Sequence, residues 1–349
     1  MKRTEKKDFL RKQSLRFFTA ILLGFLLFSC IRDKAKENKL ADFFQKDTVT
    51  ILVTDSGLGG LSIAADVARR LKEQPVFKSA RVIFFNAQMD KHTGYNDMKT
   101  TRQKVQIFNN ALQAMNREFH PDLLLIACNT LSVLYDQTDF SRQAAFPVKG
   151  IVQTGAELIE RNLKKVAHSK VIIFATQTTV RQGKHKALLM ANGIEGERIV
   201  TQACPHLAGS IERGPHSAKT VALVQQYVDS ALHVLNDDHS PLFVSYNCTH
   251  YGYVDDVFRK AFEEKGRPVQ AFLNPNPFMA NFLFEQKARP SFKHCDLTVT
   301  VVSQPELSPN KIDNISNLIA PISAQTAEAL KNYVHRPHFF EWKTIAGQR

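Results

Sequence analysis

Short apolar runs, rich in β-branched residues, alternate with longer amphipathic stretches along most of this chain. Most of the runs are nearly continuous in apolar residues, which is typical of strands buried on both faces of a sheet. Strands that alternate with helices predict an α/β fold with largely parallel sheets. The predicted strands are Val49–Asp55, Arg81–Asn86, Asp122–Cys128, Val148–Gln153, Lys170–Thr176, Arg198–Ala203, Leu242–Asn247 and Leu297–Ser303, and the predicted helices include Gly60–Lys72, Lys99–Phe119, Gly155–Lys165 and Thr220–Leu235.

The chain has 349 residues, of which 44% are hydrophobic, enough for one large domain or two ordinary ones. Its formal net charge is +13, and residues 1–47 hold twelve Lys or Arg against six Asp or Glu. The charge excess is therefore concentrated in the N-terminal segment. No basic stretch is interleaved with aromatic residues and no nucleic-acid-reading motif occurs, so the sequence argues against a nucleic-acid partner.

The first residues of the chain resemble a bacterial export signal. A basic segment precedes the apolar run Phe17–Phe28, which is short for a membrane span. The run ends in Leu27-Phe28-Ser29-Cys30, which resembles a lipoprotein processing site. We therefore expect residues 1–29 to be a signal peptide, Cys30 to be lipidated and residues 30–47 to be a tether. The folded body would face the periplasm or the cell exterior, and an uncleaved signal anchor would export it in the same way.

The chain contains five cysteines, and none of them forms a CxxC pair. This spacing argues against a zinc knuckle, and we predict no metal site. Cys204 and Cys295 are expected to be structural, since a free cysteine usually behaves as a small buried apolar residue.

Two of the cysteines follow predicted strands in similar contexts. Leu123–Ala127 ends in Cys128-Asn129-Thr130, and Phe243–Tyr246 ends in Asn247-Cys248-Thr249-His250. In open α/β sheets, ligands bind beyond the carboxyl ends of strands and against the N-termini of helices. A helix N-terminus also lowers the pKa of a thiol, so both positions favour reactive cysteines over packing.

A glycine-rich segment, Asp55-Ser56-Gly57-Leu58-Gly59-Gly60, connects the first predicted strand to the first predicted helix. Its spacing is not GxGxxG, and no GK[ST] follows, so it matches neither a dinucleotide fingerprint nor a P-loop. Taken alone, it is also consistent with a tight turn in which Ser56 or Asp55 caps the helix.

Together these motifs resemble the aspartate/glutamate racemase superfamily, and within it glutamate racemase. The resemblance extends from about Thr48 to about Leu330, and Ser132 and His250 match the glutamate type. The matching segments, in the order of the family, are Asp55–Gly60, Ala127-Cys128-Asn129-Thr130-Leu131-Ser132, Ala203-Cys204-Pro205 with Glu212 downstream, and Cys248-Thr249-His250-Tyr251.

The resemblance implies two similar α/β domains with the active site in the cleft between them. Domain 1 would comprise residues 48–152 and 254–330, domain 2 residues 153–253, and residues 331–349 would be a C-terminal tail. The implied reaction inverts the α-carbon of an acidic amino acid, with L-glutamate to D-glutamate favoured, and it requires neither pyridoxal phosphate nor a metal. A base on one face of the α-carbon and an acid on the other make this inversion feasible.

The resemblance also implies roles for ten residues. Cys128 and Cys248 would be the acid and base, with Asp55 as the partner of the first thiol. Further partners and substrate contacts would be His250 and Glu212 beside Cys248, then Ser56, Asn129, Thr130 and Thr249 on the substrate carboxylates and amine, and Thr179 as another substrate-binding residue.

The sequence departs from the family pattern in three places. Asp90–Asp97 replaces the usual Pro-Tyr-Gly segment that helps to hold the side-chain carboxylate, Asn247 replaces a glycine, and Gly252 replaces a proline. An export signal is also unusual, since the family normally supplies cytoplasmic synthesis of cell-wall peptidoglycan. Two alternatives therefore stay open: a racemase for aspartate or another amino acid, and a periplasmic amino-acid-binding protein that kept the cleft. A homodimer is open as well.

Overall fold

The computed structural model describes residues 38–236, 239–285 and 292–347. The chain divides into two compact units. The first contains the residues up to Lys46 together with Ala145–Pro147, and residues 38–44 in it are helical. The second, Asp47–Ala144 and Val148–Arg349, contains both of the sheets described below. The predicted signal peptide, the lipidation of Cys30 and most of the tether lie outside the described residues.

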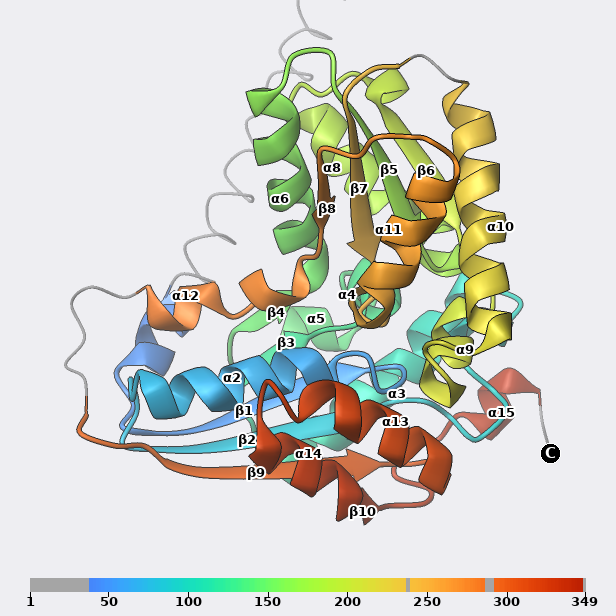
Figure 1. Cartoon of the computed structure of the whole chain (residues 1–349). Helices are drawn as coiled ribbons and strands as arrows, with labels where there is room; N and C mark the ends of the chain where they lie inside the picture. The colour runs from blue at the N-terminus through green and yellow to red at the C-terminus, as the bar shows by residue number, and fades with distance from the viewer. Residues whose placement is uncertain (1–37, 237–238, 286–291, 348–349) are drawn as a thin grey trace, which may run out of the picture. The chain divides into compact units, whose positions relative to one another are not determined.

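Six parallel strands form the first sheet in the described part of the chain (Figure 1). β1 is central and pairs with β2 on one side and β3 on the other, with Asp55 opposite Asn86 and Thr54 opposite Ile126. In spatial order the strands are β10 (Val334–His335), β9 (Asp296–Ser303), β2 (Ser79–Asn86), β1 (Thr48–Asp55), β3 (Leu123–Ile126) and β4 (Val148–Gly150).

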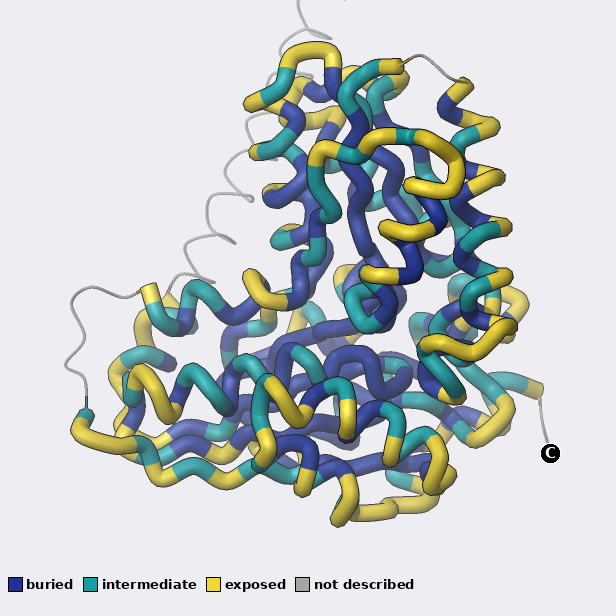
Figure 2. Tube along the Cα trace, viewed as in Figure 1, coloured by how far each residue is buried: buried dark blue, intermediate teal, exposed yellow. Residues whose placement is uncertain are grey.

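Helices cover this sheet because each has an apolar face. α2 (Leu61–Glu73) packs on β2 and β9, while α14 (Ala324–Lys331) packs on β9 and on α13 (Pro309–Ile319). α3 (Thr101–Phe119) begins at a capping box made by Thr100 and Gln103, and its last residue, Phe119, meets the ring of Phe85 in β2. The carboxyl-terminal halves of β1 and β2 are buried, whereas β9 is buried only at its last three residues and β10 is exposed (Figure 2).

Four parallel strands form the second sheet within the described residues, in the order β6 (Ile199–Ala203), β5 (Lys170–Ala175), β7 (Leu242–Asn247) and β8 (Ala271–Leu273). One face packs on α6 (Ile151–Lys165) and α8 (Lys184–Ala191). The other face packs on α10 (Ala218–Leu235) and α11 (Asp255–Glu264), around the rings of Phe174, Tyr246 and Phe258. Every residue of β7 is buried, as the apolar run predicts.

Shorter elements connect these layers. No described helix combines the length and the apolar character needed to cross a bilayer. The short elements are η1 (Tyr95–Asp97), α4 (Asn129–Tyr135), α5 (Phe140–Gln143), α7 (Gln177–Gln182), η2 (Gly196–Arg198), α9 (Leu207–Arg213), η3 (Tyr251–Val254), η4 (Asn276–Phe278), α12 (Asn281–Phe284) and α15 (Lys343–Ala346).

The structure confirms the predicted α/β class with parallel sheets, and it corrects several boundaries. The predicted strand Val148–Gln153 ends at Gly150, and α6 begins at Ile151. Ile151 and Val152 are β-branched, but they belong to the helical apolar face that continues with Ala156 and Ile159. The predicted strand Asp122–Cys128 ends at Ile126, because Cys128 already caps α4.

Two short strands were absent from the prediction. β8 pairs with β7, so the chain leaves the second sheet only after Leu273, whereas the predicted boundary of domain 2 is at residue 253. β10 lies in the predicted C-terminal tail and pairs with β9. Both strands have three residues or fewer, too short for a hydrophobic period to be recognised.

Candidate active site

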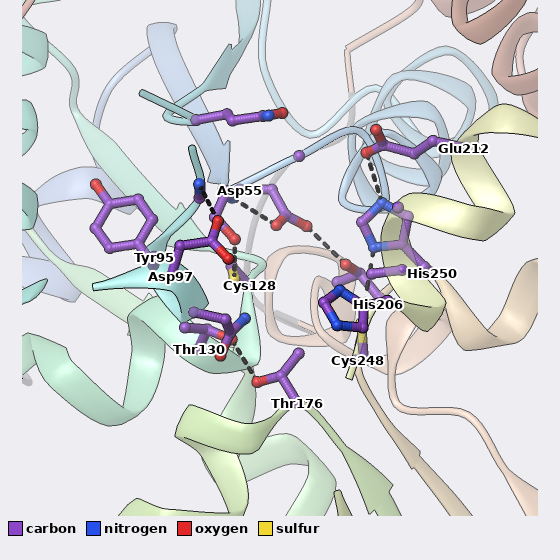
Figure 3. Close-up of a pocket in the computed structure, with 18 of the residues that line it drawn as sticks. Asp55, Tyr95, Asp97, Cys128, Thr130, Thr176, His206, Glu212, Cys248 and His250 are labelled. Carbon is purple, nitrogen blue, oxygen red and sulfur yellow. Dashed lines mark hydrogen bonds and ion pairs between the residues drawn. The ribbon is translucent and has the colours of Figure 1, made fainter. Parts of the chain in front are cut away.

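One cavity of about 280 Å³ lies at the carboxyl ends of strands from both sheets (Figure 3). In the first sheet, β1 and β3 are neighbours, so the residues that follow them share an edge. In the second sheet, β5 lies between β6 and β7, which brings the residues that follow these three strands to one edge. The lining residues directly after these strands include Ser56, Cys128, Asn129, Thr176, Cys204, Cys248 and Thr249.

Cys128 lies on the first-sheet side of the cavity and is almost fully buried. Its Sγ is 3.1 Å from the hydroxyl oxygen of Ser56. Burial raises the pKa of the Cys128 thiol well above its usual range, and the nearby carboxylate of Asp55 raises it further. The hydrogen bond from Ser56 opposes this shift without cancelling it. The thiol therefore retains its proton at neutral pH.

Asp55 connects the two sides of the cavity. One carboxylate oxygen accepts the backbone N–H of Ser56 at 2.6 Å, and the other accepts the hydroxyl of Thr249 at 2.7 Å. Burial raises the pKa of this carboxyl, while the charge of His250 lowers it. The Asp55 carboxyl also interacts with the Cys128 thiol, and the predicted partnership of these two residues requires this contact.

Cys248 lies on the second-sheet side, and an imidazole is its nearest polar partner. Nδ1 of His250 is 3.7 Å from Cys248 Sγ, and Nε2 is 2.8 Å from a carboxylate oxygen of Glu212. Burial would lower the pKa of His250, but hydrogen bonds to Cys248 and Glu212 raise it well above its ordinary value. The imidazole is therefore protonated at neutral pH, and its charge faces the sulfur.

Glu212 anchors this chain of contacts. It is buried in α9, and one of its oxygens also accepts the backbone N–H of Leu58 at 2.8 Å. The other oxygen is 2.8 Å from Nζ of Lys311 in α13. Burial would raise the pKa of Glu212, but His250 and Lys311 lower it well below its usual range. A buried carboxylate with this set of partners is a fixed negative charge behind His250.

The glycine-rich segment passes close to this group of side chains. A Cβ atom at Gly57 would lie 2.7 Å from a carboxylate oxygen of Glu212, and one at Gly59 would lie 2.6 Å from Nδ1 of His250. Both distances are shorter than real Cβ contacts. Glycine is therefore required because Glu212 and His250 press against the turn, which makes the motif part of the site.

Asn129 and Thr130 form another wall of the cavity. The Asn129 side chain is 1% exposed, and neither its oxygen nor its nitrogen has a hydrogen-bond partner within the described residues. Buried amides are normally paired, so this unpaired amide on a cavity wall suits the predicted contact with substrate. Thr130 Oγ1 is 2.7 Å from Thr176 Oγ1, which joins the two sides of the cavity.

The segment Thr176-Gln177-Thr178-Thr179 contributes Thr176 to the cavity wall, whereas the sequence predicts Thr179 as the substrate-binding residue. Thr176 lines the cavity, whereas Thr179 is buried behind it, with the two hydroxyl oxygens 3.0 Å apart. Thr176 caps α7 and leaves Thr179 inside the helix. Any contact between substrate and this segment is therefore direct at Thr176 and indirect at Thr179.

The segment that departs from the family pattern also lines the cavity, through Lys91, His92 and Gly94 and through η1 (Tyr95–Asp97). Asp97 accepts the backbone N–H of Gly94 at 2.7 Å, which closes the short turn. Asn96 accepts hydrogen bonds from the amide and hydroxyl of Thr178 at 3.1 and 2.7 Å. This segment is therefore fixed to α7.

Sequence reasoning missed several lining residues. His206 lies on the cavity wall with a left-handed backbone (φ 64°), which is unusual for a residue other than glycine. Lys311 comes from α13, far along the chain from every motif. Cys204 also borders the cavity, although its buried thiol points to the carbonyl of Gln202 at 3.7 Å. The position of His206 directly after Cys204-Pro205 was the one available signal.

The described residues contain neither a metal-binding group nor a disulfide-bonded cysteine. Among the described residues, no three His, Cys, Asp or Glu side chains are grouped in a way that could hold a metal ion. Cys128, Cys204, Cys248 and Cys295 are all free thiols.

Comparison with known proteins gives a consistent set of relatives. No family model matches the chain. It is 26% identical over 255 residues to a glutamate racemase of Lysinibacillus sphaericus, covering 69% of this chain and 86% of that protein. It is 28% identical over 216 residues to a glutamate racemase of Nitratiruptor, covering 61% of this chain and 76% of the relative.

Solved structures share the fold. A glutamate racemase from Francisella tularensis in complex with D-glutamate superposes with a TM-score of 0.59 and 18% identity, covering 78% of this chain and 94% of that one. The RacE1 isoform of glutamate racemase from Bacillus anthracis gives 0.58 and 19%, covering 79% and 94%.

The sequence relatives and the motifs around the cavity make the chain similar to the aspartate/glutamate racemase superfamily, a class of isomerases. Within that superfamily, the two sequence relatives described above are glutamate racemases.

Proposed function

We propose that this protein interconverts the enantiomers of an acidic amino acid, with L-glutamate to D-glutamate as the favoured reaction. The observation that carries the proposal is the pair of thiols: Cys128 and Cys248 line the same cavity from different sheets, each with its own polar partners. A binding protein has no need of two thiols placed in this way.

The chemistry assigns each proton transfer to a side chain of this chain. A thiolate on one face of the α-carbon removes the α-proton, and the thiol on the other face donates its own proton to the opposite side. The configuration inverts, and the two sulfurs exchange their protonation states. The other enantiomer then uses the same two groups in reversed roles.

The charges around the thiols support a defined resting state. Cys128 keeps its proton because burial and Asp55 raise its pKa. Cys248 lies beside His250, whose pKa is raised well above its ordinary value. We therefore assign Cys128 the role of acid for the first substrate that the enzyme binds, and the role of base goes to Cys248.

The substrate class follows from the cavity wall and from the relatives. Asn129 offers an unpaired amide, and Arg213 and His206 bring basic side chains to the lining, whereas the charge of Lys311 is paired with Glu212. Basic groups of this kind favour a substrate with more than one carboxylate. The relatives are named as glutamate racemases, which makes glutamate the first candidate. The altered segment up to Asp97 keeps aspartate and other amino acids as alternatives.

A circular dichroism assay of the purified protein against a panel of L- and D-amino acids tests the proposal. Glutamate should lose its optical signal from either enantiomer, and the α-proton should exchange with solvent deuterium. Tight binding of an amino acid without any exchange would favour the binding-protein alternative. Turnover of another amino acid in preference to glutamate would keep the reaction class and change the substrate.

We also propose that the protein is exported and anchored through a lipid on Cys30. The support is the sequence alone: a basic segment, a short apolar run and Leu27-Phe28-Ser29-Cys30. Mass spectrometry of the membrane-extracted protein should find a mature chain that begins at an acylated Cys30. A chain that still begins at Met1 would favour the uncleaved anchor.

A further inference from the structure

The Leu273–Pro277 segment, which contains Asn-Pro-Asn-Pro, reaches the turn that carries Cys248. Asn276 begins η4 and is 5% exposed. Its Nδ2 donates to the backbone carbonyl of Thr249 at 2.9 Å. Thr249 directly follows Cys248 and precedes His250, so the bond holds the centre of the catalytic turn.

The same nitrogen donates a second hydrogen bond, to the hydroxyl oxygen of Ser62 at 3.0 Å. Ser62 lies in the first turn of α2 and donates to the carbonyl of Gly59 in the glycine-rich segment at 3.0 Å. A side-chain amide nitrogen carries two hydrogens, so Asn276 joins the turn of the second sheet to the turn of the first, in addition to the hydrogen bond from Thr249 to Asp55.

The orientation of the Asn276 amide is fixed by its partners. The carbonyl of Thr249 can only accept, so the nitrogen must face it. The Asn276 oxygen is consequently buried without a hydrogen-bond partner within the described residues. An unpaired buried acceptor costs stability. The two donated hydrogen bonds, and not any local preference of the loop for asparagine, therefore explain why position 276 is an asparagine.

The neighbouring residues hold the segment close to the turn. Asn274 accepts the backbone N–H of Asn276 at 3.1 Å. A Cβ at Gly252 would collide with the Asn274 amide, so the glycine that departs from the family pattern makes room for this segment. Gly252 and the Asn-Pro-Asn-Pro sequence thus belong to one packing arrangement.

We propose that Asn276 is a positioning residue for the Cys248 thiol. It acts through the Thr249 carbonyl and keeps the turn in register with the glycine-rich segment opposite. The proposal rests on the proposed racemisation for its kinetic consequence, but the geometry that it predicts for Cys248 can be measured without turnover.

The first test compares alkylation of the thiols by iodoacetamide in the full-length protein, resolved by mass spectrometry for each cysteine. In an Asn276→Ala variant, Cys248 should react several-fold faster than in the wild type, because its turn has lost an attachment. Cys128 should react at an unchanged rate. An unchanged Cys248 rate, or an equal change at both thiols, would overturn the proposal.

The second test follows inversion and deuterium exchange of the α-proton for each enantiomer of glutamate. Inversion should fall about tenfold or more in both directions, since small displacements of a catalytic group have effects of that size. Exchange without inversion should persist for the enantiomer deprotonated by Cys128 and be lost for the other. A purely structural role would lower exchange for both enantiomers equally, and that result would contradict the proposal.

Two further variants serve as a control and as a substitute in these tests. Asn110→Ala removes a comparable bond, from a side-chain amide to the carbonyl of Glu341 at 3.0 Å, and should leave both readouts unchanged. Ser62→Ala removes one of the two bonds of Asn276, together with the bond from Ser62 to the Gly59 carbonyl. It should give a smaller change of the same kind, so it replaces Asn276→Ala if that variant does not fold. A wild type that shows neither inversion nor exchange contradicts the proposed function, while the alkylation rates still decide the role of Asn276.

Discussion

The two cysteines that face the cavity have opposite electrostatic surroundings. Cys128 has a serine hydroxyl and the carboxylate of Asp55 beside it, and its pKa is raised by burial and by that charge. Cys248 has the imidazole of His250 beside it, backed by the buried carboxylate of Glu212. The same side-chain type thus faces a negative group on one side and a protonated ring on the other.

This difference has a consequence for a reaction that needs one acid and one base. Two identical surroundings would leave both thiols protonated or both ionised for part of the time, and neither state can invert a substrate. Different surroundings let the two thiols take different roles, and the Cys128 thiol keeps its proton in the empty enzyme. The asymmetry therefore prepares the site for one enantiomer, and the reaction itself regenerates the state that suits the other.

Replacing either cysteine by serine should produce the largest effect. A hydroxyl is a far weaker acid than a thiol, so inversion should fall by at least about a hundredfold in both directions for Cys128→Ser and for Cys248→Ser. Each variant should still exchange the α-proton of one enantiomer, and the two variants should retain opposite enantiomers. Circular dichroism and NMR in deuterated solvent measure the two rates.

Cys295→Ser is the matched control, because this thiol is partly exposed and does not line the cavity. It should behave like the wild type. Near-normal inversion by Cys248→Ser would exclude the two-thiol mechanism, and loss of exchange for both enantiomers in both variants would argue against separate roles for the two sides.

Glu212→Gln should have the next largest effect, and it should act chiefly through His250 on the Cys248 side. Loss of the carboxylate removes the charge that helps to hold the pKa of His250 above its ordinary value. If catalysis needs protonated His250, activity declines as pH rises through that pKa. The variant should therefore show a kcat lower by about tenfold and an alkaline limb displaced to lower pH. A pH–rate profile measures both.

The free energy of unfolding should report the same pair. The pKa of Glu212 is lowered from 4.5 on folding, so its contribution is present above about pH 4.5 and is lost as pH falls through the folded value. The pKa of His250 is raised from 6.5, so its contribution is complete below about pH 6.5 and is lost as pH rises. Glu118→Gln, which breaks an exposed ion pair with Arg336, is the control and should change neither profile. If the alkaline limb of the pH–rate profile does not shift in Glu212→Gln, Glu212 does not control the pKa of His250 during catalysis.

His206→Leu should have a smaller effect, mainly on binding. The imidazole lies on the Cys248 side of the cavity, without a hydrogen bond to any described residue. We expect it to contact a substrate carboxylate, so the KM for glutamate should rise several-fold while kcat changes little. His206→Gly removes the side chain and also relieves the left-handed backbone, which separates lost contact from released strain. A normal KM in both variants would exclude His206 from binding.

Much of the fold followed from the sequence because buried parallel strands leave a continuous apolar signal, as in Leu242–Asn247, where the predicted strand is the observed one. Both cysteines could be placed at a sheet edge for the same reason. Ile151 and Val152 were misassigned to a strand because β-branched residues also fit the buried face of a helix. Strands as short as β8 and β10 leave no periodic signal.

The site was predictable only where its residues adjoin a motif. Asp55, Asn129 and His250 could be named because each lies within a recognisable segment. Lys311 could not, since it comes from an ordinary amphipathic helix and acquires its role from the ion pair with Glu212. The two hydrogen bonds that Asn276 donates are likewise a property of the folded chain, and the sequence Asn-Pro-Asn-Pro does not predict them.

The smallest expected effect concerns the support behind Cys248. His185 in α8 is buried, and its Nε2 has no hydrogen-bond partner within the described residues. Burial lowers the pKa of His185 from 6.5 to about 4. The unfolded chain therefore binds a proton between these values and the folded chain does not, so His185 makes stability decrease as pH falls from about 6.5 to about 4, by at most about 3 kcal/mol. A Cβ at Gly155 would lie 3.5 Å from this nitrogen and 2.8 Å from the Asn247 amide, so the group borders the strand end that carries Cys248.

In His185→Leu, the free energy of unfolding from urea titrations should depend less steeply on pH across this window than in the wild type. The pH dependence should weaken because the variant lacks one proton-binding site in its unfolded state. This expectation does not depend on how much the packing of leucine changes stability at pH 7. His216→Gln, at an exposed position, is the control. If His185→Leu keeps the wild-type slope, the acid sensitivity belongs to other groups. A second outcome is that the slope falls and the alkylation rate of Cys248 in acid also becomes less dependent on pH. Protonation of His185 then loosens the Cys248 side before the rest of the protein. The two sides of the cavity would differ in stability as well as in charge.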